Sequence, residues 1–147
     1  MNAQLPTDDE TRIRALIEGR VAAAATKDSG TLAAGYADDV VLYDVVGPLR
    51  HTGAEAHTRR VAEWLALYDG GIGYWIRDLH ITVGEDVAFC HYLYQVSGTT
   101  TGGTDVRMWV RSTVCLRRTD GSWRITHEHT SVPFDGETGA ASLDLQP

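Results

Sequence analysis

The chain has 147 residues, of which 43% are hydrophobic and 22% are charged, values typical of one ordinary globular domain. Its two cysteines, Cys90 and Cys115, are too few for a disulfide scaffold, and both lie in apolar segments. A net charge of −7 argues against nucleic acid or an anionic membrane as a partner. The polar N-terminal segment and the lack of an apolar run of about 18 residues predict a cytoplasmic protein.

The first predicted helix begins at a capping box. Thr7 and Glu10 have the required spacing, and apolar residues follow at helical intervals: Ile13, Leu16, Ile17, Val21 and Ala24. The pattern predicts that this helix ends near residues 27–30 and that a short second helix covers residues 32–36.

A third helix is predicted after the strand-like segment VVLYDVVGP. Thr52 and Glu55 repeat the capping pattern, and apolar residues again follow at helical spacing: Val61, Trp64, Leu65 and Tyr68. The spacing predicts a helix with one apolar face.

From Ile72 onward the hydrophobic period changes to two. Trp75, Leu79, Ile81 and Val83 alternate with polar or aromatic neighbours, and turn sequences separate four predicted strands: 74–83, 87–97, 105–118 and 122–131. Helices followed by strands predict an α+β domain with three N-terminal helices on one face of an antiparallel sheet. Strands this long must curve, so we expect a cone with an internal cavity. Residues 1–134 would form this single domain, and residues 135–147 a flexible tail.

Two segments carry a resemblance to known proteins. Residues 36–53, YADDVVLYDVVGPLRHTG, resemble the segment around the catalytic aspartate of bacterial ketosteroid isomerases. Residues 120–134, DGSWRITHEHTSVPF, are similar to the last hairpin of SnoaL-like proteins and of the association domain of calcium/calmodulin-dependent protein kinase. The resemblance implies the cone fold of the nuclear-transport-factor-like superfamily. That superfamily includes isomerases, polyketide cyclases, epoxide hydrolases and assembly modules, so it implies the fold more than an activity.

The isomerase resemblance places the proton-transferring aspartate at Asp44. A carboxylate in an apolar cavity loses solvation and becomes a better base for a carbon acid beside a carbonyl. Alternatively, Asp44 is a turn residue that hydrogen-bonds the backbone ahead of Gly47 and Pro48. The position of the isomerases' oxyanion tyrosine carries Arg20, and their second donor falls near residues 113–114. An arginine there favours a substrate with an anionic or strongly polarised oxygen.

The last predicted strand offers a second candidate cluster. His127 and His129 project to one face, and Glu128 and Thr130 project to the other. Periodicity favours the histidines, since the Trp and Ile of WRITHEH share their face. The kinase resemblance favours the opposite phase, and a bulge would reconcile the two.

Several further residues are candidates for the cavity. Arg111 either holds a carboxylate or enolate oxygen there or lies at the surface, stacked on Trp109. The other predicted lining residues are aromatic or polar: Arg20, Tyr36, Trp64, Trp75, Tyr92, Tyr94, Trp109 and Thr113. A metal site of His127, His129 and either His80 or His91 is an alternative to histidines hydrogen-bonded at a subunit interface. We predict neither a metal nor a cofactor.

Two functions from different classes fit these patterns. The first is a cofactor-independent isomerase or cyclase acting on a small apolar carbonyl compound. Asp44 would remove a proton, and Arg20, Arg111 or a strand histidine would stabilise the oxyanion. An epoxide hydrolase is a variant of it. The second is a non-catalytic ligand-binding or dimerisation module. An apolar sheet face predicts a homodimer under both hypotheses, and an open cavity beside Asp44 would favour the enzyme.

Overall fold

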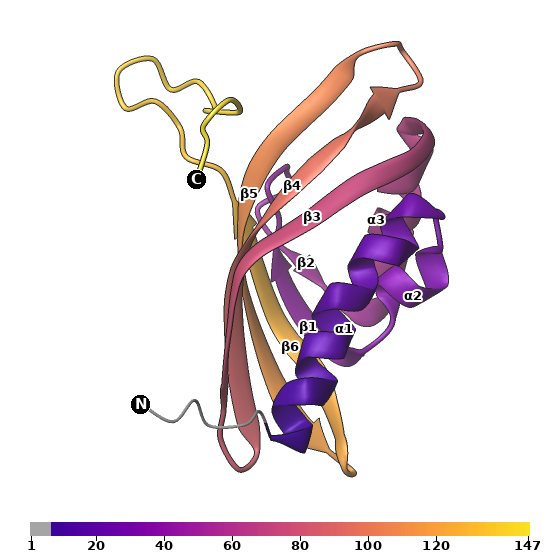
Figure 1. Ribbon diagram of the computed structural model, residues 1–147, viewed down its shortest axis with the longest axis vertical. Helices are drawn as coiled ribbons and strands as arrows, with labels where there is room; N and C mark the ends of the chain where they lie inside the picture. The colour runs from indigo at the N-terminus through magenta and orange to yellow at the C-terminus, as the bar shows by residue number, and fades with distance from the viewer. Residues whose placement is uncertain (1–6) are drawn as a thin grey trace.

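The computed structural model describes residues 7–147, which form helices packed on one side of a strongly bent sheet (Figure 1). The elements follow in chain order: α1 (Asp8–Ala25), α2 (Ser29–Ala33), β1 (Tyr36–Tyr43), β2 (His51–Thr52), α3 (Ala54–Ala66), β3 (Tyr68–Val83), β4 (Val87–Thr100), β5 (Asp105–Thr119) and β6 (Ser122–Ser131). The predicted α+β class with a curved sheet and N-terminal helices is confirmed, and the sheet stays open rather than closing into a barrel.

Local capping explains where the helices begin. The Thr7 hydroxyl accepts a hydrogen bond from the Glu10 amide at 3.1 Å, as the capping box predicts. The second helix, α2, lies earlier in the chain than the predicted residues 32–36, because Asp28 caps it and it ends at Ala33, before β1 begins. The capping prediction for α3 was wrong: Gly53 occupies the cap position, and Thr52 belongs to the short strand β2.

The sheet has six strands in the order β2-β1-β6-β5-β4-β3. β1 runs parallel to β6, and the other neighbours are antiparallel. Because β1 pairs with β6, Leu42 lies opposite Glu128, and the segment after Tyr43 begins beside the end of β6. This pairing brings the sequence around Asp44 next to the last strand.

A bulge in β6 reconciles the two phases considered for this strand. Ile125 pairs with Leu116 and His127 pairs with Cys115, so Thr126 is an extra residue without a partner. Before it, Ile125 faces the core and is fully buried; after it, Glu128 faces the same side and is 7% exposed. The phase favoured by periodicity, with the histidines inside, is therefore wrong beyond Thr126.

A second bulge changes the phase of β3. Arg77 pairs with Leu93 and His80 pairs with His91, which leaves one residue too many between them. Asp78 has a left-handed φ of 56° at this point. The predicted alternation is wrong before the bulge, so Trp75 lies on the outer face with 68% of its surface exposed.

The segment after β6 folds back on itself and projects from the sheet (Figure 1). Phe134 forms a β-bridge with Ala141, the Asp135 carboxylate accepts hydrogen bonds from the Glu137 and Thr138 amides, and the Ser142 amide donates to the Pro133 carbonyl. That residues 135–147 are flexible stays a prediction.

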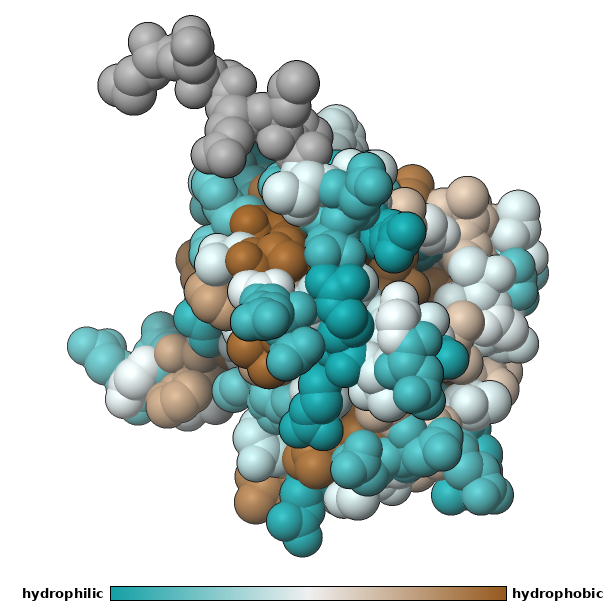
Figure 2. Space-filling model, turned by 90° about the horizontal axis from the view of Figure 1, so that it is seen from below, coloured by the Kyte–Doolittle hydropathy of each residue, from teal (hydrophilic) through white to brown (hydrophobic). Residues whose placement is uncertain are grey.

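The surface seen from below is mostly hydrophilic, with small separated apolar patches (Figure 2). Within residues 7–147, no helix is both long enough and apolar enough to cross a membrane.

Candidate functional site

A cavity of about 330 Å³ lies between the helices and the concave face of the sheet. Most of its wall is apolar or aromatic: Leu32, Leu42, Val61, Trp64, Tyr68, Tyr74, Tyr94, Val96, Met108 and Val110. Six residues with strongly polar side chains also line it: Arg20, Asp44, His57, Arg60, Glu128 and Thr130. Side chains do not fill this cavity, so it has room for a small ligand.

A buried charge pair forms the cavity floor. The Arg20 Nη1 atom donates to Glu128 Oε1 at 2.6 Å and to the Tyr92 hydroxyl at 2.7 Å. Its Nη2 donates to the Tyr36 hydroxyl at 2.8 Å, and that hydroxyl donates to Glu128 Oε2 at 2.6 Å. We call these four residues the floor cluster. Both charges are satisfied inside the protein, so Arg20 is not left free to hold an anionic substrate.

The surroundings of the floor cluster keep Glu128 and Arg20 charged and Tyr36 protonated. Burial alone would raise the pKa of Glu128, but Arg20 and the Tyr36 hydroxyl outweigh it and hold that pKa below its usual value. Burial would lower the pKa of Arg20, yet the adjacent Glu128 carboxylate raises it well above the usual range. Burial also raises the pKa of Tyr36, so its hydroxyl keeps its proton.

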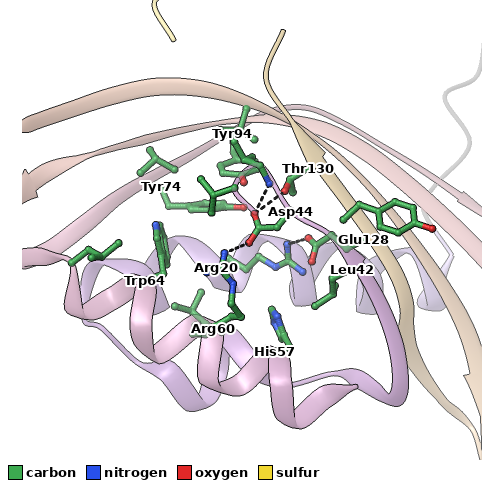
Figure 3. A pocket seen from close by; sticks show the side chains of 18 of the residues that line it. Arg20, Leu42, Asp44, His57, Arg60, Trp64, Tyr74, Tyr94, Glu128 and Thr130 are labelled. Atoms are coloured by element: carbon green, nitrogen blue, oxygen red, sulfur yellow. Dashed lines mark hydrogen bonds and ion pairs between the residues drawn. The ribbon is translucent and has the colours of Figure 1, made fainter. Parts of the chain in front are cut away.

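A second charge pair lies nearer to solvent, at the cavity mouth (Figure 3). Asp44 Oδ2 accepts from Arg60 Nη2 at 2.6 Å, and its Oδ1 accepts from the Val45 amide at 2.6 Å and the Thr130 hydroxyl at 3.3 Å. The Asp44 side chain is 36% exposed, and the Arg60 side chain is 26% exposed. Asp44 therefore lines the cavity and also makes the backbone hydrogen bond considered as its alternative role.

The helix α3 supplies two cavity residues that the sequence analysis missed, His57 and Arg60. The His57 ring packs against the Tyr36 ring with centroids 3.9 Å apart, and burial lowers the pKa of His57 below its usual value. Among residues 7–147, neither His57 Nε2 nor Arg60 Nε has a hydrogen-bond partner, although both atoms are buried. Spacing was the available signal, because His57 lies four and seven residues before Val61 and Trp64 on the apolar face of α3.

The predicted site residues fall into two groups. The first group lines the cavity: Arg20, Tyr36, Asp44, Trp64, Tyr94 and Glu128. Tyr92 lies behind them in the floor cluster. The cavity wall does not include Trp75, Trp109, Arg111, Thr113, His127 or His129. The reason is strand phase: Val110, Ser112 and Val114 of β5 are buried, so the residues between them face outward.

The outer histidines make contacts of their own. His127 Nδ1 lies 2.7 Å from the Val41 carbonyl, and the His80 and His91 rings are neighbours with centroids 5.3 Å apart. Within the described part of the chain, no three His, Cys, Asp or Glu side chains come together in a group that could hold a metal ion.

Comparison with known proteins identifies the family of this chain. Residues 13–135 match the SnoaL-like domain family. An NTF2-like protein of unknown function from Pseudomonas putida KT2440 is 32% identical, with a TM-score of 0.86 over 98% of this chain and 100% of that one. The chain belongs to the SnoaL-like, NTF2-like family. The predicted superfamily is thereby confirmed.

More distant solved structures have the same fold. A protein from Xanthomonas campestris, provisionally named a calcium/calmodulin-dependent protein kinase II association domain, is 27% identical with a TM-score of 0.70, covering 88% of this chain and 91% of that one. An NTF2-like protein from Streptomyces avermitilis, provisionally named a dehydratase, is 20% identical with a TM-score of 0.74, covering 88% and 100%. Among curated proteins, none matches the sequence significantly.

Proposed function

We propose that this protein is a cofactor-independent enzyme that removes a proton from the carbon next to the carbonyl of a small apolar compound, as an isomerase or cyclase does. The observation that carries the proposal is the contact between Asp44 and Arg60 in the wall of an open, mainly apolar cavity. A base and a hydrogen-bond donor for the developing oxyanion are the two groups that such a reaction needs.

Asp44 is the base in this proposal. Among residues 7–147 its Oδ2 has one hydrogen-bond donor, Arg60, and a carboxylate oxygen has room for a second, so a substrate proton can be accepted there. The Val45 amide and the Thr130 hydroxyl hold the other oxygen and orient the carboxyl group. A fixed base loses little entropy when it meets the substrate carbon.

Arg60 replaces Arg20 and Arg111 as the oxyanion donor. When the C–H bond breaks, its electrons form an enolate and the proton goes to Asp44. One negative charge leaves the carboxylate as another appears on the substrate oxygen. A guanidinium has five N–H donors, so Arg60 can serve both oxygens in turn while the net charge of the cavity stays constant. In an isomerase the enolate is conjugated with a second double bond, and the proton returns from Asp44 to the far carbon of that system. In a cyclase the enolate carbon attacks a second carbonyl carbon of the same molecule, and the electrons of that C=O π bond form an alkoxide that takes the proton from Asp44.

A test of this proposal uses 2-tetralone, a small ketone with acidic C–H bonds. The wild-type protein in D₂O should exchange these protons faster than buffer, as followed by NMR. Asp44→Asn should lower the enzymatic rate by about 10²–10⁴-fold, the usual contribution of a general base. Asp39→Asn makes the same change on an exposed residue of β1 outside the cavity wall and should leave the rate unchanged.

The alternative is a protein that binds a small ligand in this cavity without turnover. It is favoured by the charge pairing, since both cavity carboxylates already have arginine partners. If 2-tetralone binds and its protons exchange no faster than in buffer, the binding function replaces the enzymatic one.

A further inference from the structure

The ionised side chains that line the cavity are balanced in number and in position. Among residues 7–147 they comprise Arg20, Asp44, Arg60 and Glu128. Arg20 lies 2.6 Å from Glu128, and Arg60 lies 2.6 Å from Asp44. Each guanidinium therefore has its own carboxylate, and the cavity wall carries no net charge.

Burial keeps further titratable side chains of the wall uncharged. Burial lowers the pKa of His57, which keeps its ring neutral at neutral pH. Burial raises the pKa values of Tyr36, Tyr74 and Tyr94, which keeps their hydroxyls protonated. A charged ligand would lose its hydration on entering this cavity and would find no uncompensated counter-charge.

An uncharged oxygen acceptor, by contrast, has a hydrogen-bond partner in Arg60. The buried Arg60 Nε has no acceptor among residues 7–147, and a buried donor left unpaired costs free energy that a ligand oxygen can recover. The walls favour rings, because Tyr74 and Tyr94 stack with centroids 4.6 Å apart and their planes at 12°, beside Trp64 (Figure 3).

We propose that the cavity selects an uncharged ring compound with an acceptor oxygen, such as a ketone or phenol, and rejects the corresponding carboxylate because its own charges are paired. This selectivity rests on the proposed function only in taking the cavity as the substrate site. Of the two alternatives expected for Arg20, a substrate with an anionic oxygen or one with a strongly polarised oxygen, it keeps only the second, because Glu128 already neutralises that arginine.

The test compares two probes of matched shape, 2-naphthol and 2-naphthoate, by fluorescence titration at neutral pH, where the first is uncharged and the second is an anion. Wild-type protein should bind 2-naphthol at least about tenfold more tightly, the ratio that about 1.4 kcal/mol of selectivity produces.

Variants that unpair one arginine should shift this ratio toward the anion. Asp44→Asn frees Arg60 and Glu128→Gln frees Arg20, and each should change the ratio by about tenfold or more in favour of 2-naphthoate. Glu63→Gln changes the net charge of the protein by the same amount at an exposed position of α3 outside the cavity wall, so it should leave the ratio unchanged.

Asp44→Asn alters a partly exposed residue, so it provides the test even if Glu128→Gln does not fold. The proposal is overturned if wild-type protein binds 2-naphthoate as tightly as 2-naphthol, if neither probe binds, or if Asp44→Asn leaves the ratio unchanged. Failure of 2-tetralone exchange would contradict the enzymatic function without affecting the binding ratio.

Discussion

Arg20 Nη1 and Glu128 Oε1 lie 2.6 Å apart, although 108 positions separate the two residues in the sequence. Their side chains are only 10% and 9% exposed, so this ion pair joins α1 to β6 beneath the cavity in a region that water hardly reaches. In such a place each charged side chain is stable only while its partner is present, because either charge alone would be buried without compensation.

Removing one partner should therefore destabilise the protein strongly. Glu128→Ala leaves Arg20 as an unpaired buried charge and should lower the free energy of unfolding by about 3–5 kcal/mol, as measured by urea denaturation. The double variant Arg20→Met/Glu128→Leu should be more stable than the single variant, since it removes both charges. Glu55→Ala breaks an exposed pair with Arg59 and should cost at most about 0.5 kcal/mol. A Glu128→Ala protein as stable as wild type would contradict this account.

The pH dependence of stability should carry a contribution from His57. Burial lowers the pKa of His57 in the folded protein below the usual 6.5. Between those two values the unfolded state binds more protons, so stability increases with pH through this window. The His57 contribution is complete above the unfolded value and is lost as the pH falls toward the folded one.

His57→Gln should remove this part of the pH dependence. Urea denaturation of both proteins between about pH 7.5 and pH 5.5 would show the difference as a flatter curve for the variant. Glu128 does not interfere, because its pKa is held below a usual value of 4.5, outside this range. Equal slopes for the two proteins would show that His57 is not a buried neutral side chain.

Arg60 should matter for catalysis more than for folding. Arg60→Met removes the proposed oxyanion donor and should lower the rate of 2-tetralone exchange by about 10²–10³-fold. Arg60→Lys should recover part of this loss, because it keeps the charge without the planar fork. Arg59→Met, an exposed neighbour on the same helix, serves as the control. A normal exchange rate in Arg60→Met would exclude the oxyanion role.

The outer face of the sheet should be dispensable for this chemistry. Arg111 and His129 are exposed and do not line the cavity, so replacing either by alanine should change the exchange rate by no more than about twofold. Exchange rates and unfolding midpoints measured together would separate a catalytic effect from loss of folded protein. A large loss of rate in a folded variant would move the site to the outer face.

Two glycines should respond oppositely to alanine. A Cβ at Gly71 would overlap the Ala25 carbonyl oxygen, so Gly71→Ala must push β3 away from the end of α1. Such overpacking should cost about 1–3 kcal/mol. Gly19 lies within α1 with nothing within 4 Å of its Cβ position, and Gly19→Ala should stabilise the protein by up to about 1 kcal/mol. Thermal unfolding of both variants would check the two signs, and a stabilised Gly71→Ala protein would contradict the close approach.

The amino-acid sequence by itself determined the elements whose causes are local. Thr7 caps α1 through a residue three positions away, and the change from helical to alternating periodicity marks the start of the four consecutive long strands β3 to β6. The position of Asp44 beside a cavity could also be expected, because its surrounding segment resembles that of a known active site. His57 could have been found from its spacing, since it continues the apolar face of α3.

Only the tertiary structure decided which side chains face the cavity. The unpaired Thr126 reverses the phase of β6 and turns Glu128 inward, and nothing in the local sequence distinguishes an extra residue from a paired one. The pairing of Arg20 with Glu128 and of Arg60 with Asp44 likewise depends on how α1, α3 and β6 pack. The cavity carries no net charge because these two pairs form in its wall. Contacts between residues remote in sequence arise only when the chain folds.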